Sequence, residues 1–225
     1  MAGVIGQKMK KIRTRVKICG LTRAEDVNAA VAAGADAVDL VFYPPSSRYV
    51  SPENACDLRS LVPAMVSVVA LFVNASNEDV QQVIDQVQPD ILQFHGDESP
   101  DECEQYGRRY MKAFRVGAPG LDTPQAVLET CRRYRSASAW LFDSYSAGYG
   151  GSGKQFDLGL LEMVIASPES RPVVLAGGLN VETVGAAIAH VAPFAVDVSS
   201  GVEISGGVKC AGKIRAFMQA VALSR

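Results

Sequence analysis

Cys19 and Asp143 are the two residues whose types and positions suggest acid–base chemistry. Cys19 ends the apolar run 16–19, and Asp143 directly follows the apolar run 140–142. A carboxyl group at an apolar strand end must be hydrogen-bonded or functional, and burial helps it to keep a proton that it can donate. A cysteine at the end of a buried strand is more often a small apolar packing residue, so the residues by themselves leave both roles open. The other cysteines, at 56, 103, 131 and 210, fall in expected helices and are predicted to pack.

Two further segments carry small residues that favour phosphate binding. Gly177-Gly178 follows one apolar run, and Ser199-Ser200-Gly201 follows the next. A phosphate needs converging backbone N–H donors with no side chain in the way, which such segments supply at the ends of strands. The alternative is that these residues only close tight turns and cap helices. Their occurrence after two successive strands favours a phosphate site.

Four other polar residues lie near expected strand ends and are candidate site residues, with solvated or hydrogen-bonded structural roles as alternatives. They are Arg48, Gln93, His95 and Asp197. With two histidines in the chain and no CxxC pair, the sequence indicates neither a metal site nor a cofactor.

The segment 148–155 contains two patterns that imitate nucleotide-binding motifs. Gly148, Gly150 and Gly153 match GxGxxG, and Gly153-Lys154 resembles a P-loop ending, but Gln155 stands where that loop needs Ser or Thr. No helix is expected to start directly after the last glycine. We therefore expect a loop that covers the site.

Short apolar runs alternate with segments of helical period along the chain. The expected strands are 16–19, 36–41, 67–73, 91–94, 111–116, 139–142, 172–176 and 194–198. The expected helices are 23–33, 53–61, 78–87, 101–108, 125–134, 158–166, 181–191 and 209–223. Continuously apolar strands joined by helices indicate a parallel sheet covered on both faces. Eight regular units in 225 residues predict an α/β fold, a single-domain eight-stranded parallel (β/α)8 TIM barrel, with an open doubly wound sheet as the alternative.

Composition and charge exclude several classes of protein. The chain has 22 basic and 24 acidic residues, a net charge of -2 and 48% apolar residues, so we expect a folded protein that binds neither nucleic acid nor membrane. Residues 1–15 read as a basic, flexible tail before a catalytic domain at 16–225. The odd, widely spaced cysteines favour a reducing cytoplasm. We expect a monomer or homodimer that binds a small phosphorylated molecule.

Six motifs, in this order, resemble those of the phosphoribosylanthranilate isomerase family. They are VKICGLT at 16–22, VFYPPSSRYVSP at 41–52, LQFHGDE at 92–98, FDSYSAGYGGSGKQFD at 142–157, LAGGLN at 175–180 and AVDVSSGVE at 195–203. The resemblance implies a cofactor-free isomerase of tryptophan biosynthesis. Its reaction would be the Amadori rearrangement of N-(5'-phosphoribosyl)anthranilate to 1-(2-carboxyphenylamino)-1-deoxyribulose 5-phosphate.

The resemblance also implies roles for individual residues. Cys19 matches the family's base, Asp143 its acid, and Arg48 the arginine that pairs with the anthranilate carboxylate. Gln93, His95 and Asp197 match residues that line the site, and the phosphate positions match Gly177, Gly178, Ser199, Ser200 and Gly201. After Glu203 the chain departs from the family, because the segment 204–210 reads ISGGVKC instead of a Pro-Gly turn followed by Lys-Asp.

Two other functions remain open on the sequence. A related sugar-phosphate barrel, such as an isomerase that acts on a histidine-pathway ribonucleotide or a lyase of the tryptophan pathway, is expected to carry two carboxylates or a lysine base instead. A module that binds a sugar phosphate without turnover would keep the phosphate site. The presence of both Cys19 and Asp143 favours the isomerase.

Overall fold

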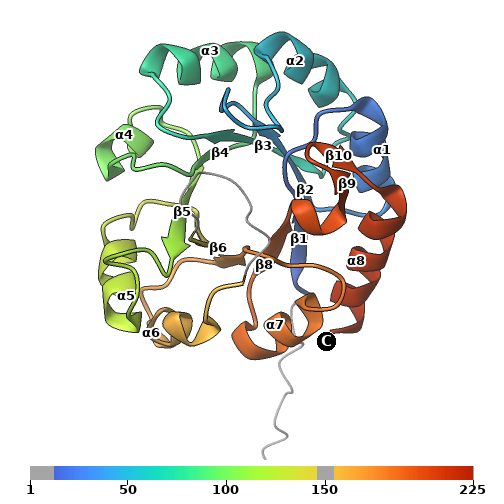
Figure 1. The fold of residues 1–225 in the computed structure, drawn as a ribbon. Coiled ribbons are helices and arrows are strands. Elements are labelled where there is room, and N and C mark those ends of the chain that lie inside the picture. The colour runs from blue at the N-terminus through green and yellow to red at the C-terminus, as the bar shows by residue number, and fades with distance from the viewer. Residues whose placement is uncertain (1–12, 146–154, 225) are drawn as a thin grey trace, which may run out of the picture.

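The computed structural model describes residues 13–145 and 155–224. Eight parallel strands, β1 to β8, close into a barrel in which β1 pairs with both β2 and β8. Figure 1 looks along this barrel and shows the helices as an outer ring around the strands. The predicted TIM barrel is therefore confirmed, and the open sheet is excluded.

The strands lie close to the predicted positions. Their bounds are β1 Arg15–Ile18, β2 Ala37–Val41, β3 Ser67–Phe72, β4 Ile91–Phe94, β5 Tyr110–Val116, β6 Ala139–Ser144, β7 Val173–Leu175 and β8 Ala195–Val198. Arg15 was assigned to the tail, but it belongs to β1 because it pairs with Ala195 at the closing seam. Residues 1–12 of the expected tail, and most of the expected loop at 148–155, lie outside the described residues.

The helices are α1 Ala24–Ala32, α2 Pro52–Ser60, α3 Asn77–Val87, α4 Pro100–Glu104, α5 Pro124–Arg132, α6 Glu162–Ala166, α7 Val184–Val191 and α8 Ala211–Leu223. Ser51, Ser99 and Thr123 cap α2, α4 and α5 as their positions before Pro predict, each accepting a backbone N–H. α3 differs, since Ser76 caps it instead of Asn77.

Three helical segments are shorter than predicted. α4 ends at Glu104, and a 3₁₀ turn, η1 (Leu158–Leu161), precedes α6. α7 begins only at Val184, because the Asn180 side chain accepts the backbone N–H groups of Glu182 and Thr183 and forms a turn there.

The chain after β8 contains a hairpin that the sequence did not predict. A 3₁₀ turn, η2 (Ser200–Val202), leads into β9 (Glu203–Ser205), which pairs antiparallel with β10 (Val208–Lys209). Gly207 has φ +80 in the turn, and the Thr22 hydroxyl donates to its carbonyl oxygen at 2.6 Å. This contact attaches the hairpin to the loop after β1.

Side-chain alternation along the strands separates two layers of packing. Alternate residues face outward and pack against the helices in one large apolar cluster that includes Ile18, Phe94 and Trp140. The other residues face the barrel interior, where Val69, Met111, Leu141 and their neighbours fill the part nearer to the starts of the strands. Cys19, Val41, Leu71 and Val73 form a separate cluster in the interior. Among the described residues, no helix is long and apolar enough to cross a membrane.

Candidate active site

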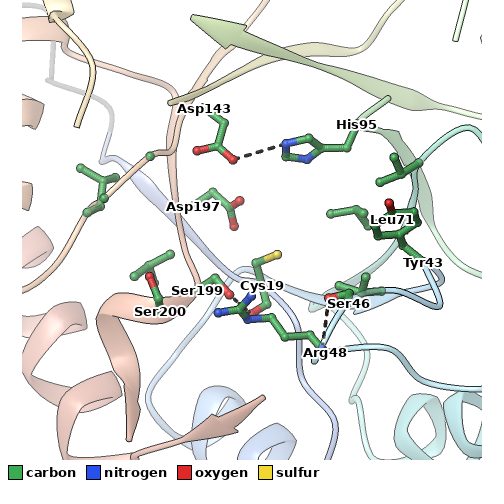
Figure 2. A pocket seen from close by; sticks show the side chains of 16 residues that line it. Cys19, Tyr43, Ser46, Arg48, Leu71, His95, Asp143, Asp197, Ser199 and Ser200 are labelled. Carbon is green, nitrogen blue, oxygen red and sulfur yellow. Dashed lines mark hydrogen bonds and ion pairs between the residues drawn. The ribbon is translucent and has the colours of Figure 1, made fainter. Parts of the chain in front are cut away.

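A pocket opens inside the barrel at the end where the strands finish. Cys19, Arg48, His95, Asp143, Asp197 and the segments 177–179 and 198–200 line it together with Tyr43 and Ser46. Figure 2 shows the labelled side chains of these residues around one space, with Asp143 and His95 together and Cys19 beside Arg48. Loops at the carboxyl ends of barrel strands carry the chemistry in this fold. The structure thus brings nine of the eleven predicted site residues to the same pocket, while Gln93 and Gly201 lie outside its lining.

Asp143 lies at the end of β6 and is partly exposed to the pocket. Its Oδ1 accepts the backbone N–H of Ser144 at 2.8 Å, and its Oδ2 lies 3.3 Å from His95 Nε2. Gln93 is fully buried, and its Nε2 lies 3.2 Å from His95 Nδ1. With the amide nitrogen donating to Nδ1, Nε2 carries the imidazole proton and faces Asp143 Oδ2. Gln93 therefore acts on the site through His95 and does not line it.

Cys19 lies at the end of β1, with 9% of its surface exposed. Its Sγ donates a hydrogen bond of 3.5 Å to Asp39 Oδ1. Burial, followed by the charge of Asp39, raises the pKa of the thiol well above its usual value, although Lys17 opposes this shift. Burial and the charge of Asp39 therefore favour the neutral thiol over the thiolate.

Arg48 reaches the pocket from the loop after β2. It packs over Gly20, whose φ of +74 and missing side chain leave the space that the Arg48 chain occupies. Its Nε and Nη2 donate to the two carboxylate oxygens of Glu203 at 2.8 and 2.7 Å. This paired geometry was expected toward a substrate carboxylate, but Glu203 already uses it, which leaves the remaining guanidinium edge for a ligand.

Three acidic and basic residues at the site were missed from the sequence as functional candidates. Lys17 and Asp39 are buried inside β1 and β2, and Lys17 Nζ lies 2.7 Å from Asp39 and 3.0 Å from Asp197. Lys209 Nζ donates to Glu203 Oε1 at 2.7 Å from β10. Charged residues on the same strand face as Cys19, inside otherwise apolar runs, are the signal that could have identified Lys17 and Asp39.

Asp197, at the end of β8, faces the pocket between these groups. Burial raises the pKa of its carboxyl to about 6, and Lys17 moderates the effect while Asp39 adds to it. In Figure 2 its carboxylate lies between Asp143 and Cys19. Asp197 is thus positioned to contact a ligand that spans both residues.

The expected phosphate segments meet at one side of the pocket. Gly177 and Gly178 follow β7 with φ values of +81 and +64, which favour glycine. The Ser199 hydroxyl donates to the Cys19 carbonyl oxygen at 3.1 Å, so it joins the β1 and β8 ends. Gly201 lies within η2 against the Leu179 carbonyl, and its lack of a side chain is required by that packing.

Cys210, predicted to pack inside a helix, lies instead directly before α8 and is partly exposed. Backbone N–H groups of Lys213 and Gly212 lower the pKa of its thiol. Among residues 13–145 and 155–224, no cluster of three or more His, Cys, Asp or Glu side chains could hold a metal ion.

Comparison with known proteins relates this site to a family. The model of the N-(5'-phosphoribosyl)anthranilate isomerase family matches residues 16–220. A protein of this name from Bordetella parapertussis is 60% identical over 210 residues, covering 93% of this chain and 96% of the relative.

Solved structures agree with this match. A phosphoribosylanthranilate isomerase in complex with reduced 1-(o-carboxyphenylamino)-1-deoxyribulose 5-phosphate is 37% identical with a TM-score of 0.80, covering 93% of this chain and 98% of that one. A structure of monomers generated from the dimeric enzyme of Thermotoga maritima has the same identity, coverage and TM-score. With the family model matching most of its length and a relative at 60% identity, the chain belongs to the N-(5'-phosphoribosyl)anthranilate isomerase family.

Proposed function

We propose that Asp143 and Cys19 are the acid and the base with which this isomerase converts N-(5'-phosphoribosyl)anthranilate into 1-(2-carboxyphenylamino)-1-deoxyribulose 5-phosphate. The observation that carries this assignment is that both side chains line one pocket together with the two phosphate segments. They come from β6 and β1, which are separated by β7 and β8 around the barrel. A substrate held by its phosphate therefore has an acid and a base within one cavity.

The first step needs an acid. Opening the furanose ring requires a proton on the ring oxygen as the bond between this oxygen and C1' breaks and the nitrogen forms an imine. Asp143 supplies the proton, and its contacts with Ser144 N and His95 Nε2 fix the orientation of its carboxyl group. Gln93 on β4 orients His95, so residues from β4 as well as β6 fix the position of the Asp143 carboxyl group.

The second step needs a base. Removing the proton from C2' leaves its electron pair to form the C1'–C2' double bond while the π pair of the protonated imine returns to nitrogen. The resulting enol becomes the ketone of the product when its 2'-hydroxyl loses a proton and C1' gains one. Cys19 accepts this proton on Sγ after the thiol has ionised. Its position at the end of β1 is fixed, because Cys19 N donates to the Val198 carbonyl and Ser199 Oγ donates to the Cys19 carbonyl.

Binding groups lie at the two ends of the pocket. We assign the substrate phosphate to the backbone of Gly177, Gly178, Ser199, Ser200 and Gly201, where small residues allow close approach. We assign the anthranilate carboxylate to Arg48, using the guanidinium edge that Glu203 leaves. Asp197 contacts the sugar between these ends.

Two substitutions test the assignment. Asp143→Asn keeps the shape of the acid but removes its proton, and Cys19→Ser raises the pKa of the base, so each should lower kcat about 10²- to 10⁴-fold with little change in affinity. Turnover is followed by the fluorescence of the anthranilate group, and binding is measured with the reduced product analogue. Asp57→Asn and Cys56→Ser, in the outer helix α2, make the same chemical changes away from the pocket and should remain active. Folded variants that bind the analogue and turn over within tenfold of the wild type would refute the acid–base pair.

A further inference from the structure

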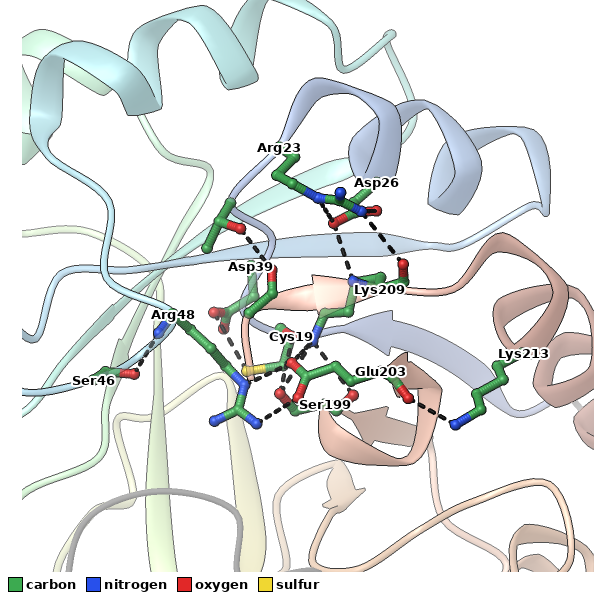
Figure 3. A network of polar contacts seen from close by, with 12 residues as sticks. Cys19, Arg23, Asp26, Asp39, Ser46, Arg48, Ser199, Glu203, Lys209 and Lys213 are labelled. Atoms are coloured by element: carbon green, nitrogen blue, oxygen red, sulfur yellow. Dashed lines mark hydrogen bonds and ion pairs between the residues drawn. The ribbon is translucent and has the colours of Figure 1, made fainter. Parts of the chain in front are cut away.

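Cys19 belongs to a buried network of charges that extends beyond the groups used in the mechanism. Figure 3 shows Cys19, Asp39, Arg48, Glu203 and Lys209 converging from four parts of the chain. Asp39 is fully buried in β2, and each of its carboxylate oxygens has its own partner. Oδ2 accepts from Lys17 Nζ at 2.7 Å, and Oδ1 accepts from Cys19 Sγ at 3.5 Å.

The charges that face Cys19 balance only when its thiol is neutral. The cations are Lys17 on β1, Lys209 on β10 and Arg48 after β2; the carboxylates are Asp39 on β2, Asp197 on β8 and Glu203 on β9. The remaining neighbours in the Cys19 cluster are Val41, Leu71, Val73 and Tyr43, and Asp143 and His95 lie across the pocket. Ionising the thiol would add an uncompensated negative charge to a site from which water is largely excluded.

Asp39 contributes to this balance more directly than the other carboxylates do. Glu203 is bound by both Arg48 and Lys209, and Asp197 is paired with Lys17. Among the carboxylates of the described residues, Asp39 is the one given a hydrogen bond from Cys19 Sγ. A carboxylate accepts a hydrogen bond from a thiol but repels a thiolate at the same distance. Asp39 therefore favours one protonation state of Cys19 and opposes the other.

We propose that Asp39 is a positioning residue that holds the Cys19 thiol in its protonated form and thereby sets the pH above which Cys19 can act as the base. This rests on the proposed function of Cys19 only in its second half, because the protonation of the thiol is measurable without turnover. Burial and the charges of Asp39 and Asp197 raise the pKa of Cys19, in agreement with the geometry.

Asp39 also divides the charge of Lys17 between two carboxylates. Burial lowers the pKa of Lys17, but the charges of Asp197 and Asp39 raise it by more, so the ammonium stays charged. Without the charge on Asp39, Lys17 would pair with Asp197 alone, and its positive charge would favour the ionisation of Cys19 more strongly than it does now. Both effects would make the thiolate easier to form. A like charge within about 4–6 Å shifts a pKa by roughly 1–3 units.

The test is the rate of Cys19 alkylation by iodoacetamide as a function of pH, measured on the peptide that contains Cys19 because Cys56 and Cys210 are more exposed than Cys19 and react as well. In the wild type the midpoint should lie above the ordinary cysteine value of about 8.5. In Asp39→Asn it should fall by about one pH unit or more, which means at least about tenfold more thiolate at a fixed lower pH. Asp57→Asn, which removes an exposed carboxylate from α2, should leave the midpoint unchanged.

A second variant and a second readout make the result decisive. Asp39→Ala removes the charge without adding an amide donor beside Sγ, and it should move the midpoint in the same direction. A wild-type midpoint at or below about 8.5, or an unchanged or higher midpoint in the folded variants, would overturn the proposal. The pH profile of kcat/KM should shift with the alkylation midpoint. If the alkylation midpoint shifts while the pH profile of kcat/KM does not, Asp39 does keep the Cys19 thiol protonated, but Cys19 is not the base.

Discussion

At the scale of single residues, the site is organised by side chains that hold other side chains. Glu203 orients the Arg48 guanidinium through two hydrogen bonds, and it also accepts from Lys209. Burial raises the pKa of Glu203, but the hydrogen bonds from Arg48 and Lys209 lower it by more, so the carboxylate stays charged. Arg48 therefore faces the pocket in a fixed orientation before substrate arrives.

Glu203→Gln should weaken substrate binding through Arg48. A neutral amide keeps one acceptor but loses the charge-assisted pair, so the lost interaction of about 1.5–3 kcal/mol corresponds to a rise in KM of roughly 10- to 150-fold, with a smaller effect on kcat. Steady-state kinetics measure this split. Glu182→Gln, at an exposed position before α7, should have no effect. An unchanged KM in folded Glu203→Gln would remove Glu203 from the positioning of Arg48.

Asp197 gives a prediction about pH and stability. Burial raises the pKa of its carboxyl from 3.8 to about 6, so between these values the folded protein binds more protons than the unfolded chain. This group therefore lowers the free energy of unfolding as the pH rises through that window, by about 3 kcal/mol for a shift of about two units. Urea unfolding of wild type and Asp197→Asn at about pH 4 and pH 7 should show the wild type losing stability relative to the variant by up to that amount. A difference between the two proteins that does not change with pH would contradict the shift.

At the scale of elements, a buried ion pair fixes the loop between β4 and α4, which begins at His95. Lys112 Nζ, on β5, donates to the Gly96 carbonyl at 2.7 Å and to Glu98 Oε2 at 2.8 Å. Glu98 in turn accepts the backbone N–H groups of Asn74 and Gly96. The loops after β3 and β4 are thereby joined beneath the site, and the backbone that carries His95 is held in place.

Lys112→Met should destabilise the whole barrel, because it leaves Glu98 buried without its cation. Breaking a buried pair costs about 3–5 kcal/mol, and a domain of this size loses roughly 2–4 °C of Tm per kcal/mol. Thermal unfolding should therefore shift down by roughly 6–20 °C. Arg132→Met breaks a pair with Glu169 whose side chains are each 43% exposed, and such surface pairs contribute about 0–1 kcal/mol. Equal shifts in the two variants would mean that burial of the Lys112 pair is unimportant.

At the scale of the whole molecule, the pocket uses residues from seven of the eight strands or the loops that follow them, so ligand binding should stabilise the closed barrel. The reduced product analogue at about 100 times its Kd should add about 2.7 kcal/mol, or roughly 5–10 °C in Tm. Inorganic phosphate at high concentration should raise Tm too and should compete with substrate.

Gly178→Ala tests where the phosphate binds. The change costs about 1–2 kcal/mol of stability because Gly178 has φ +64, and it should also reduce the rise in Tm caused by phosphate. Gly201→Val is unsuitable for this purpose, because the added side chain would collide with the Leu179 carbonyl and damage the fold itself. A full phosphate effect in folded Gly178→Ala would place the phosphate elsewhere.

The sequence by itself determined the barrel and the strand ends at which the site lies. The regular alternation of apolar runs and capped helices is a local property that can be read from the sequence. Once these strands close into a barrel, the segments 177–178 and 199–201 must lie at the carboxyl ends of the neighbouring strands β7 and β8. Cys19, Asp143 and Asp197 could be chosen because polar residues end apolar strands there. The early end of α4 and the late start of α7 depended on competing turns, which weak helix signals do not reveal.

Only the tertiary structure decided which charges meet. Lys17 and Asp39 lie 22 positions apart and contact because β1 and β2 are adjacent with alternating side chains, and Arg48 meets Glu203 across 155 positions through an unpredicted hairpin. Such pairings depend on the register and closure of the whole barrel, which no short segment specifies. For the same reason the raised pKa of Cys19 could not be foreseen, because desolvation and the signs of the surrounding charges exist only after folding.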